Sequence, residues 1–192
     1  QMYCDSRIAE QHMSNEKLNQ KTKSTMANKF AAMKKVTVRE ITRVNFQECI
    51  KLKVADHQKD WVAPNVYSIA EAKVNHRLTP LAIYDNSILG WEPKEDDPML
   101  GFLMYQVMDG IGFITRLMIG EQFQGKGYGK AAMVEVVRRL KKIPDMERIA
   151  TSVAKGNPIA EKMYRDLGFV DVDKPDEREM YLKLPWDPKR PE

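Results

Sequence analysis

The stretch Ile111-Gly-Phe-Ile-Thr-Arg-Leu-Met-Ile119 leads through Gln124-Gly-Lys-Gly-Tyr-Gly129 into Lys130-Ala-Ala-Met-Val-Glu-Val-Val-Arg-Arg-Leu140. Its first part has the apolar pattern of a β-strand, and its last part has the pattern of an amphipathic helix. Glycines between them let the backbone approach a ligand closely, and the unpaired N–H groups of the helix's first turn would face that ligand. The stretch predicts an anion-binding loop, suited to phosphate. An ordinary tight turn is the alternative that this stretch alone leaves open.

A second motif follows further along the chain: Asn157-Pro-Ile-Ala160-Glu-Lys-Met-Tyr164-Arg-Asp-Leu-Gly168-Phe169. In order and separation, the two motifs resemble the GNAT acetyltransferase superfamily. In that family the first motif holds the pyrophosphate of acetyl-coenzyme A. The second lines the pantetheine side of the cofactor and supplies a tyrosine to the leaving sulfur. The dinucleotide fingerprint and the P-loop motif, the two commonest other phosphate cradles, are both absent.

The resemblance implies an α/β fold of the mixed α+β kind: a central, mostly antiparallel mixed sheet flanked by helices. Strands four and five would splay apart to admit the cofactor. Hydrophobic periodicity agrees with this order and predicts helices near 46–54, 69–78, 127–142 and 158–167. It predicts strands near 36–41, 79–84, 100–108, 111–119, 148–154, 169–172 and 179–184.

Three local signals support these boundaries. Ser68-Ile-Ala-Glu71 reads as a capping box at the start of the second helix. Asp109-Gly110 is a hairpin signal. Asn157 followed by proline is a typical helix cap.

Length and composition indicate one globular domain, since 192 residues with 43% apolar and 30% charged side chains are ordinary for a soluble protein. Residues 1–34 are polar and lack periodicity, so we interpret them as a loose leader, a tag or an upstream extension, with 35–192 as a single acetyltransferase domain. No long apolar run or secretion signal is visible, which predicts no membrane span and a cytoplasmic location. Cys4 and Cys49, with three scattered histidines, suggest neither a disulfide framework nor a metal site.

The net charge of +4 does not indicate a nucleic-acid-binding protein. Residues 1–35 carry seven Lys or Arg against three Asp or Glu, and the remaining residues balance at 24 each. Within that remainder, residues 121–165 hold ten basic and five acidic side chains around the glycine loop. This distribution suits an anionic cofactor better than a broad basic face for nucleic acid. Clustering on a solvated helix face is the alternative.

The resemblance assigns the chemistry residue by residue. Tyr164 would be the general acid for the leaving thiolate, although a core tyrosine with a satisfied hydroxyl is the alternative. A backbone amide near Met118 or Ile119 would meet the oxyanion, and Asn157 would bind the pantetheine amides or only cap its helix. The predicted cofactor-binding residues are Leu117, Met118, Ile119, Gln124, Gly125, Lys126, Gly127, Tyr128, Gly129, Lys130, Asn157 and Ala160.

The sequence does not identify a general base. No carboxylate lies between Ile111 and Gly120, so deprotonation of the amine would pass through ordered water or a more distant group. Glu71, Asp56 and Glu121 are candidates without supporting spacing.

A third stretch, from Leu52 to Ala72, together with the Arg116 segment resembles bacterial spermine/spermidine acetyltransferases of the diamine type. This implies transfer of acetyl to a primary amine of a polyamine such as spermidine or spermine. The predicted acceptor residues are Trp61, Tyr67, Glu71 and Arg116, with Glu48 as another carboxylate for the distal ammonium. Arg116 would repel a polyamine unless it is paired.

Other functions stay open at this point. They are acetylation of a protein or peptide amine or of an aminoglycoside, or a non-catalytic acyl-coenzyme A sensor. The family also implies a homodimer.

Overall fold

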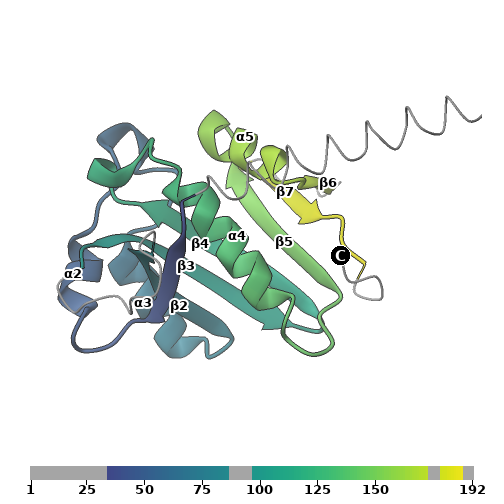
Figure 1. Cartoon of the computed structure of the whole chain (residues 1–192), viewed down its shortest axis with the longest axis horizontal. Coiled ribbons are helices and arrows are strands. Elements are labelled where there is room, and N and C mark those ends of the chain that lie inside the picture. Colours follow the sequence, from purple (N-terminus) through teal and green to yellow (C-terminus); the bar gives the residue numbers. More distant parts are fainter. Residues whose placement is uncertain (1–33, 87–96, 173–177, 188–192) are drawn as a thin grey trace, which may run out of the picture. The chain divides into compact units, whose positions relative to one another are not determined.

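The computed structural model describes residues 34–86, 97–172 and 178–187. They form a seven-stranded sheet in the order β1-β2-β3-β4-β5-β7-β6 (Figure 1). Only β4 and β5 run parallel; every other neighbouring pair is antiparallel. This mixed sheet confirms the fold class expected from the sequence. The predicted leader, residues 1–34, lies outside the described residues apart from Lys34. The strands are β1 (Val36–Glu40), β2 (Leu78–Asp85), β3 (Met99–Met108), β4 (Ile111–Ile119), β5 (Arg148–Ala154), β6 (Val170–Val172) and β7 (Glu179–Leu184).

Helices cover both faces of the sheet (Figure 1). Helix α4 (Tyr128–Leu140) packs on one face, and α2 (Phe46–Lys51) with α3 (Asn65–Val74) packs on the other. Helix α5 (Pro158–Asp166) contributes its buried residues to the α4 side. Two short 3₁₀ turns, η1 (Asp56–Gln58) and η2 (Glu121–Phe123), lie in the connections. None of the described helices has the length and apolar character that crossing a membrane would require.

Two hydrophobic clusters hold these layers together. On the α4 face, Met133, Val136 and Leu140 of the helix are fully buried because α4 turns its apolar side to the sheet. On the opposite face, the fully buried Cys49 packs with Phe102 and its neighbours. The sheet is therefore covered on both sides, and its strands read as nearly continuous apolar runs.

The parallel pair β4 and β5 separates part of the way along the strands. Their register runs from Ile111 opposite Arg148 to Ile114 opposite Thr151 and ends there. Beyond that point β4 pairs with β3 alone and β5 with β7 alone. A register shift in the β3–β4 ladder leaves Thr115 as the extra residue of a bulge, which bends β4 at this point. The splay expected between strands four and five is present.

Of the local sequence signals, the hairpin turn at Asp109-Gly110 is confirmed and the helix start at Ser68 is wrong. Asp109 and Gly110 have φ values of 50° and 74°, as a two-residue hairpin of the primed type requires. The capping box at Ser68 is wrong, because α3 already begins at Asn65. Ser68 lies inside the helix, where its hydroxyl donates to the carbonyl of Pro64 at 3.4 Å.

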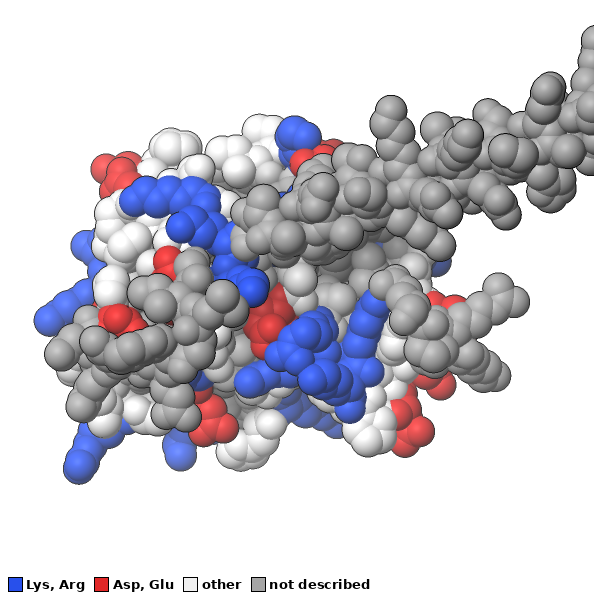
Figure 2. All heavy atoms as spheres, viewed as in Figure 1, with Lys and Arg blue, Asp and Glu red and all other residues white. Residues whose placement is uncertain are grey.

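Lys and Arg side chains gather over the C-terminal half of α4, as Figure 2 shows. Arg138 and Arg139 lie in the last turn of this helix, and Arg138 also pairs with Glu135. Cations in this position interact favourably with the carbonyl end of a helix. Much of the basic charge between residues 121 and 165 therefore lies at the end of α4 away from the glycine loop.

Candidate active site

A cavity of about 640 Å³ opens where β4 and β5 diverge. It extends from the glycine loop at the start of α4, along β4 and β5, to the connection between α2 and α3. The predicted site residues that line it are Trp61, Arg116, Leu117, Met118, Ile119, Gln124, Gly125, Gly127, Tyr128, Gly129, Lys130, Asn157, Ala160 and Tyr164. Residues from four separate regions of the sequence are thus brought to one space.

Three predicted site residues are not among those lining the cavity. Lys126 is exposed and its ammonium donates to the carbonyl of Gln122 at 3.0 Å. Tyr67 is 58% exposed on the outer side of α3. Glu71 pairs with Arg116 at the edge of the cavity. Their predicted roles stay predictions.

The glycine loop presents open backbone at the start of α4. Gly125 and Gly127 have φ values of 72° and 85°, which glycine adopts without strain. Among the described residues, a Cβ on Gly125 would meet no atom within 4 Å, and one on Gly127 would meet only Lys34 Cγ at 3.9 Å. The first helical hydrogen bond runs from Ala131 N to Gly127 O, so the preceding amides have no partner within the helix. Amides without a partner in the helix, beside this space, fit a phosphate group.

Tyr128 anchors this loop through its side chain. Its ring is buried, and its hydroxyl donates to Asp85 at the end of β2 at 2.5 Å. That hydrogen bond, with burial and the charge of Asp85, raises the pKa of Tyr128 to about 12. The side chain therefore fixes the start of α4 against the sheet, while the main chain remains available to a ligand.

The end of β4 turns alternate backbone groups toward the cavity. Gly120 N donates to Leu100 O of β3 at 2.8 Å, whereas Ile119 O accepts from the side chain of Gln124 at 2.9 Å. Because antiparallel pairing alternates along a strand, Leu117 and Ile119 direct their N–H and C=O groups away from β3. Of the two amides predicted for the oxyanion, this alternation favours Ile119 over Met118.

Tyr164 lies buried at the junction of α5 and β5. Its ring stands 5.9 Å from that of Phe169. Burial raises the pKa of Tyr164 to about 12, and the neighbouring Thr151 hydroxyl lowers it in part. Thr151 itself is buried and donates to Ile114 O at 3.0 Å, at the last paired position of β4 and β5. The tyrosine hydroxyl is therefore held protonated where the strands begin to separate.

Asn157 caps α5 as the sequence predicted. Its side-chain oxygen accepts from Ala160 N at 3.1 Å, and Pro158 occupies the first helical position. This oxygen is thus committed to the helix, although Asn157 also lines the cavity.

Trp61 and two carboxylates also line the cavity. Trp61 comes from the α2–α3 connection, and His57 packs edge-on against its ring at 6.0 Å. Asp60 of the same connection and Glu179 of β7 are the carboxylates among the lining residues. Such a wall suits a cationic amine with an alkyl chain.

The carboxylates nominated from the sequence lie elsewhere. Glu48 accepts from Met99 N at 2.7 Å and, with Glu121, lines a separate hollow of about 240 Å³. Asp56 is exposed on η1 and does not line the main cavity.

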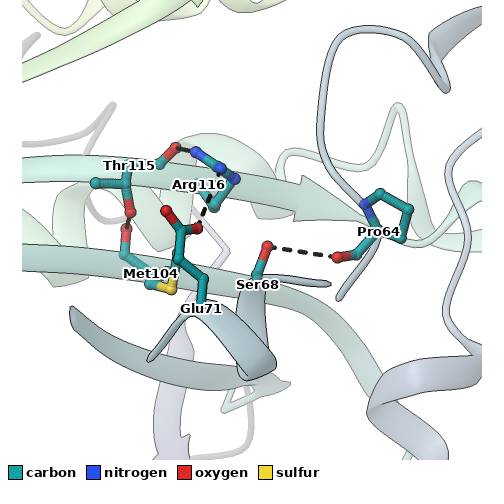
Figure 3. Close-up of polar contacts among 6 residues, drawn as sticks. All are labelled: Pro64, Ser68, Glu71, Met104, Thr115 and Arg116. Atoms are coloured by element: carbon teal, nitrogen blue, oxygen red, sulfur yellow. Dashed lines mark hydrogen bonds and ion pairs between the residues drawn. The ribbon is translucent and has the colours of Figure 1, made fainter. Parts of the chain in front are cut away.

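Arg116, which would repel a polyamine if it were unpaired, forms an ion pair with Glu71. Figure 3 shows its guanidinium directed at Glu71 of α3, with an N–O distance of 3.4 Å. A second nitrogen donates to Thr115 O at 2.9 Å, while the buried Nε has no hydrogen-bond partner among the described residues. The charge of Arg116 is therefore offset at one side of the cavity, which lowers its repulsion of a cation.

Sequence reasoning missed Gln58, Asp60, Thr151 and Glu179. They belong to segments that meet only in the folded chain. Two signals were available: Gln58 and Asp60 lie in the stretch from Leu52 to Ala72, and Thr151 is a polar residue at an inward position of an apolar strand.

Residues 46–169 match the model of the Acetyltransferase (GNAT) family. A spermine/spermidine N(1)-acetyltransferase of Bacillus subtilis (strain 168) is 25% identical over 142 residues, covering 70% of this chain and 87% of that protein.

Two solved structures share the fold. Spermidine N-acetyltransferase from Vibrio cholerae, in complex with CoA and spermine, has a TM-score of 0.61 at 14% identity and covers 78% of this chain and 95% of its own. PaiA N-acetyltransferase from Thermoplasma acidophilum, in complex with coenzyme A, has a TM-score of 0.56 at 13% identity, covering 79% and 99%.

The family match spans more than half of the chain and includes both motifs on which the prediction rested. This protein therefore belongs to the acetyltransferase (GNAT) family.

Proposed function

We propose that this protein transfers an acetyl group from acetyl-coenzyme A directly to a primary amine of a small polyamine such as spermidine or spermine. The observation that carries the proposal is one continuous cavity. Its lining includes the open start of α4, the buried Tyr164, Trp61 and Asp60 of the α2–α3 connection, and Glu179 of β7. The similarity to a spermine/spermidine acetyltransferase over 87% of that protein supports the acceptor class.

The glycine loop would hold the cofactor's diphosphate. Its free amides and the positive end of α4 favour an anion, and Lys130 adds charge at the cavity wall. The outward N–H and C=O of Leu117 would pair with the pantetheine amides as an added strand would. When bound, acetyl-coenzyme A supplies an activated thioester. No covalent enzyme intermediate is required.

Two hydrogen-bond donors, the main-chain N–H of Ile119 and the Tyr164 hydroxyl, would act in acetyl transfer. The N–H of Ile119 would donate to the acetyl oxygen as negative charge develops on it. The Tyr164 hydroxyl would donate its hydrogen bond to the departing sulfur, because its raised pKa keeps it protonated at neutral pH.

Asp60 and Glu179 are the carboxylates best placed for the acceptor. One of them would receive the amine's proton, directly or through water, and the other would meet a distal ammonium group. Both line the cavity, whereas the carboxylates nominated from the sequence do not.

A panel of amines tests the acceptor class. Purified protein with acetyl-coenzyme A would be offered spermine, spermidine, an aminoglycoside and a peptide with a free N-terminus, and thiol release would be followed. We expect turnover with the polyamines. Turnover with the peptide alone would remove the polyamine proposal, and binding of coenzyme A without turnover of any amine would favour a sensor.

The homodimer and the cytoplasmic location expected from the sequence stay predictions. Light scattering on purified protein, with and without coenzyme A, measures the first. Fractionation of cells with an antibody to the chain tests the second.

A further inference from the structure

Gln58 connects three walls of the cavity. It ends η1 and is only 9% exposed, which is unusual for a glutamine. Its side-chain oxygen accepts from Gln124 Nε2 at 2.7 Å, and its main-chain oxygen accepts from Trp61 N at 2.9 Å. One buried residue thus contacts both the acceptor wall and the segment that leads into the glycine loop.

Gln124 completes the connection. Its amide nitrogen donates both to Gln58 and to Ile119 O, the latter at 2.9 Å. An amide NH₂ has two hydrogens, so these two bonds use its full donor capacity. The cofactor loop, the end of β4 and the α2–α3 connection therefore meet at a single amide group.

Packing beside these bonds is tight. Glu121 N donates to Lys53 O at 2.9 Å. A Cβ on Gly120 would stand only 2.8 Å from Leu52 Cδ2. Residues 120–124 are thus joined to the α2–α3 connection by the Glu121–Lys53 and Gln124–Gln58 hydrogen bonds, so a shift of either segment strains its bonds to the other.

We propose that Gln58 is a positioning residue that couples the cofactor loop to the acceptor wall. This inference rests on the proposed function. An adjustment of Gln124 when the cofactor settles on the glycine loop is passed through Gln58 to Trp61 and the neighbouring Asp60. Cofactor binding then improves the acceptor site, and by linkage the acceptor improves cofactor binding by the same factor.

Calorimetry on the full chain tests this coupling. The dissociation constant of the amine with the highest kcat/KM in the panel would be measured with and without saturating coenzyme A. We expect wild-type protein to bind the amine about tenfold more tightly in the presence of coenzyme A. In Gln58→Leu, which keeps the apolar volume and loses the acceptor oxygen, we expect that ratio to fall to about one, with coenzyme A affinity alone within about twofold of wild type.

Matched variants separate coupling from general damage. Gln58→Glu retains an oxygen that accepts from Gln124 and should restore most of the ratio. Gln47→Leu changes an exposed glutamine on α2 and should leave the ratio unchanged. If Gln58→Leu does not fold, Gln58→Met keeps the unbranched side chain without the acceptor oxygen; loss of the ratio in that variant would support the inference, and an unchanged ratio would overturn it.

An unchanged ratio in folded Gln58→Leu would overturn the inference and leave the acetyltransferase proposal intact. Failure of wild-type protein to bind coenzyme A would overturn both.

Discussion

Tyr164 is held in its protonated form by its surroundings. A phenol with a pKa of about 12 is a weaker acid than a thiol, whose ordinary pKa is about 8.5. The hydroxyl therefore stabilises the departing sulfur chiefly by donating a hydrogen bond. The proton of Tyr164 moves fully to the sulfur only when the negative charge on sulfur strengthens that hydrogen bond, or when water returns a proton to the tyrosine oxygen.

Replacing Tyr164 with Phe should reduce kcat by about 10²-fold or more. The affinity for coenzyme A should stay within about twofold, because the ring that packs near Phe169 is kept. Steady-state kinetics and calorimetry measure the two quantities. Tyr105→Phe, at a buried tyrosine outside the cavity, is the matched control. Equal losses of kcat in both variants would show that Tyr164 acts only through packing.

The pH dependence of the same variant reports the ionisation of Tyr164. Its pKa of about 12 means that the hydroxyl is present throughout the neutral and mildly alkaline range. The ratio of wild-type kcat to that of Tyr164→Phe should therefore be constant from about pH 7 to pH 10. A ratio that declines with a midpoint near the ordinary tyrosine pKa of about 10 would contradict this environment.

At the level of residues, sequence reasoning succeeded where a motif is local. Tyr164 and Asn157 lie on one helix and came from a single pattern, although their chemical roles stay predictions. Gln58 and Glu179 were missed because they reach the cavity from a short 3₁₀ turn and a late strand. No spacing in the sequence relates those two segments.

Among the elements, the glycine loop makes the most specific demand on its residues. Gly127→Val should weaken coenzyme A binding by about tenfold or more, because the new side chain would occupy the space beside the free amides. The left-handed φ of 85° should also cost about 1–2 kcal/mol of stability. Calorimetry and urea denaturation measure these effects.

Gly156→Val is the matched control for the loop. Gly156 has a φ of 88°, and a Cβ there would meet no described residue within 4 Å, but Gly156 does not line the cavity. It should show the same strain with normal coenzyme A affinity. If both variants lose affinity equally, backbone strain and not steric exclusion explains the result.

Element boundaries were predictable where two independent signals coincided. β4, β5 and β7 have the predicted limits, since apolar alternation and flanking turn residues agree there. α3 was misplaced because Ser68 and Glu71 fit a capping pattern that the chain does not use. Ser68 is fully buried, so its position is set by tertiary packing and not by helix capping.

Across the whole molecule, basic charge follows α4 and is not confined to the cofactor loop. Arg138 and Arg139 lie about three turns along α4 from Gly127, about 17 Å at the usual rise per residue. Their field at a bound diphosphate is largely screened at physiological salt. The affinity for coenzyme A should therefore depend on main-chain donors more than on these arginines.

The whole fold should lose stability in alkaline solution. Burial raises the pKa of Cys49 from 9.0 and of Tyr164 from 10.0, and the bond to Asp85 raises that of Tyr128 from 10.0, each to about 12. These groups are neutral in the folded protein at pH values where they ionise in the unfolded chain. Their stabilisation is complete below about pH 9 and is lost as the pH rises toward 12.

Denaturation at a series of pH values from 8 to 11 measures this loss. Tyr164 alone should account for about 1 kcal/mol of this loss at pH 11, one unit above its ordinary pKa of about 10. The Tyr164→Phe variant should therefore show a shallower decline than wild type. Parallel curves for the two proteins would indicate that Tyr164 ionises equally in both states.

The separation of β4 and β5 also bears on how this protein can change over evolutionary time. Binding through main-chain N–H and C=O groups depends on the fold and not on particular side chains. Most side chains along these strands can therefore be substituted while binding of the shared cosubstrate is retained. The acceptor wall is made of side chains, so substitutions there change recognition of the acceptor directly. A few substitutions there would be enough to give the same scaffold a new amine.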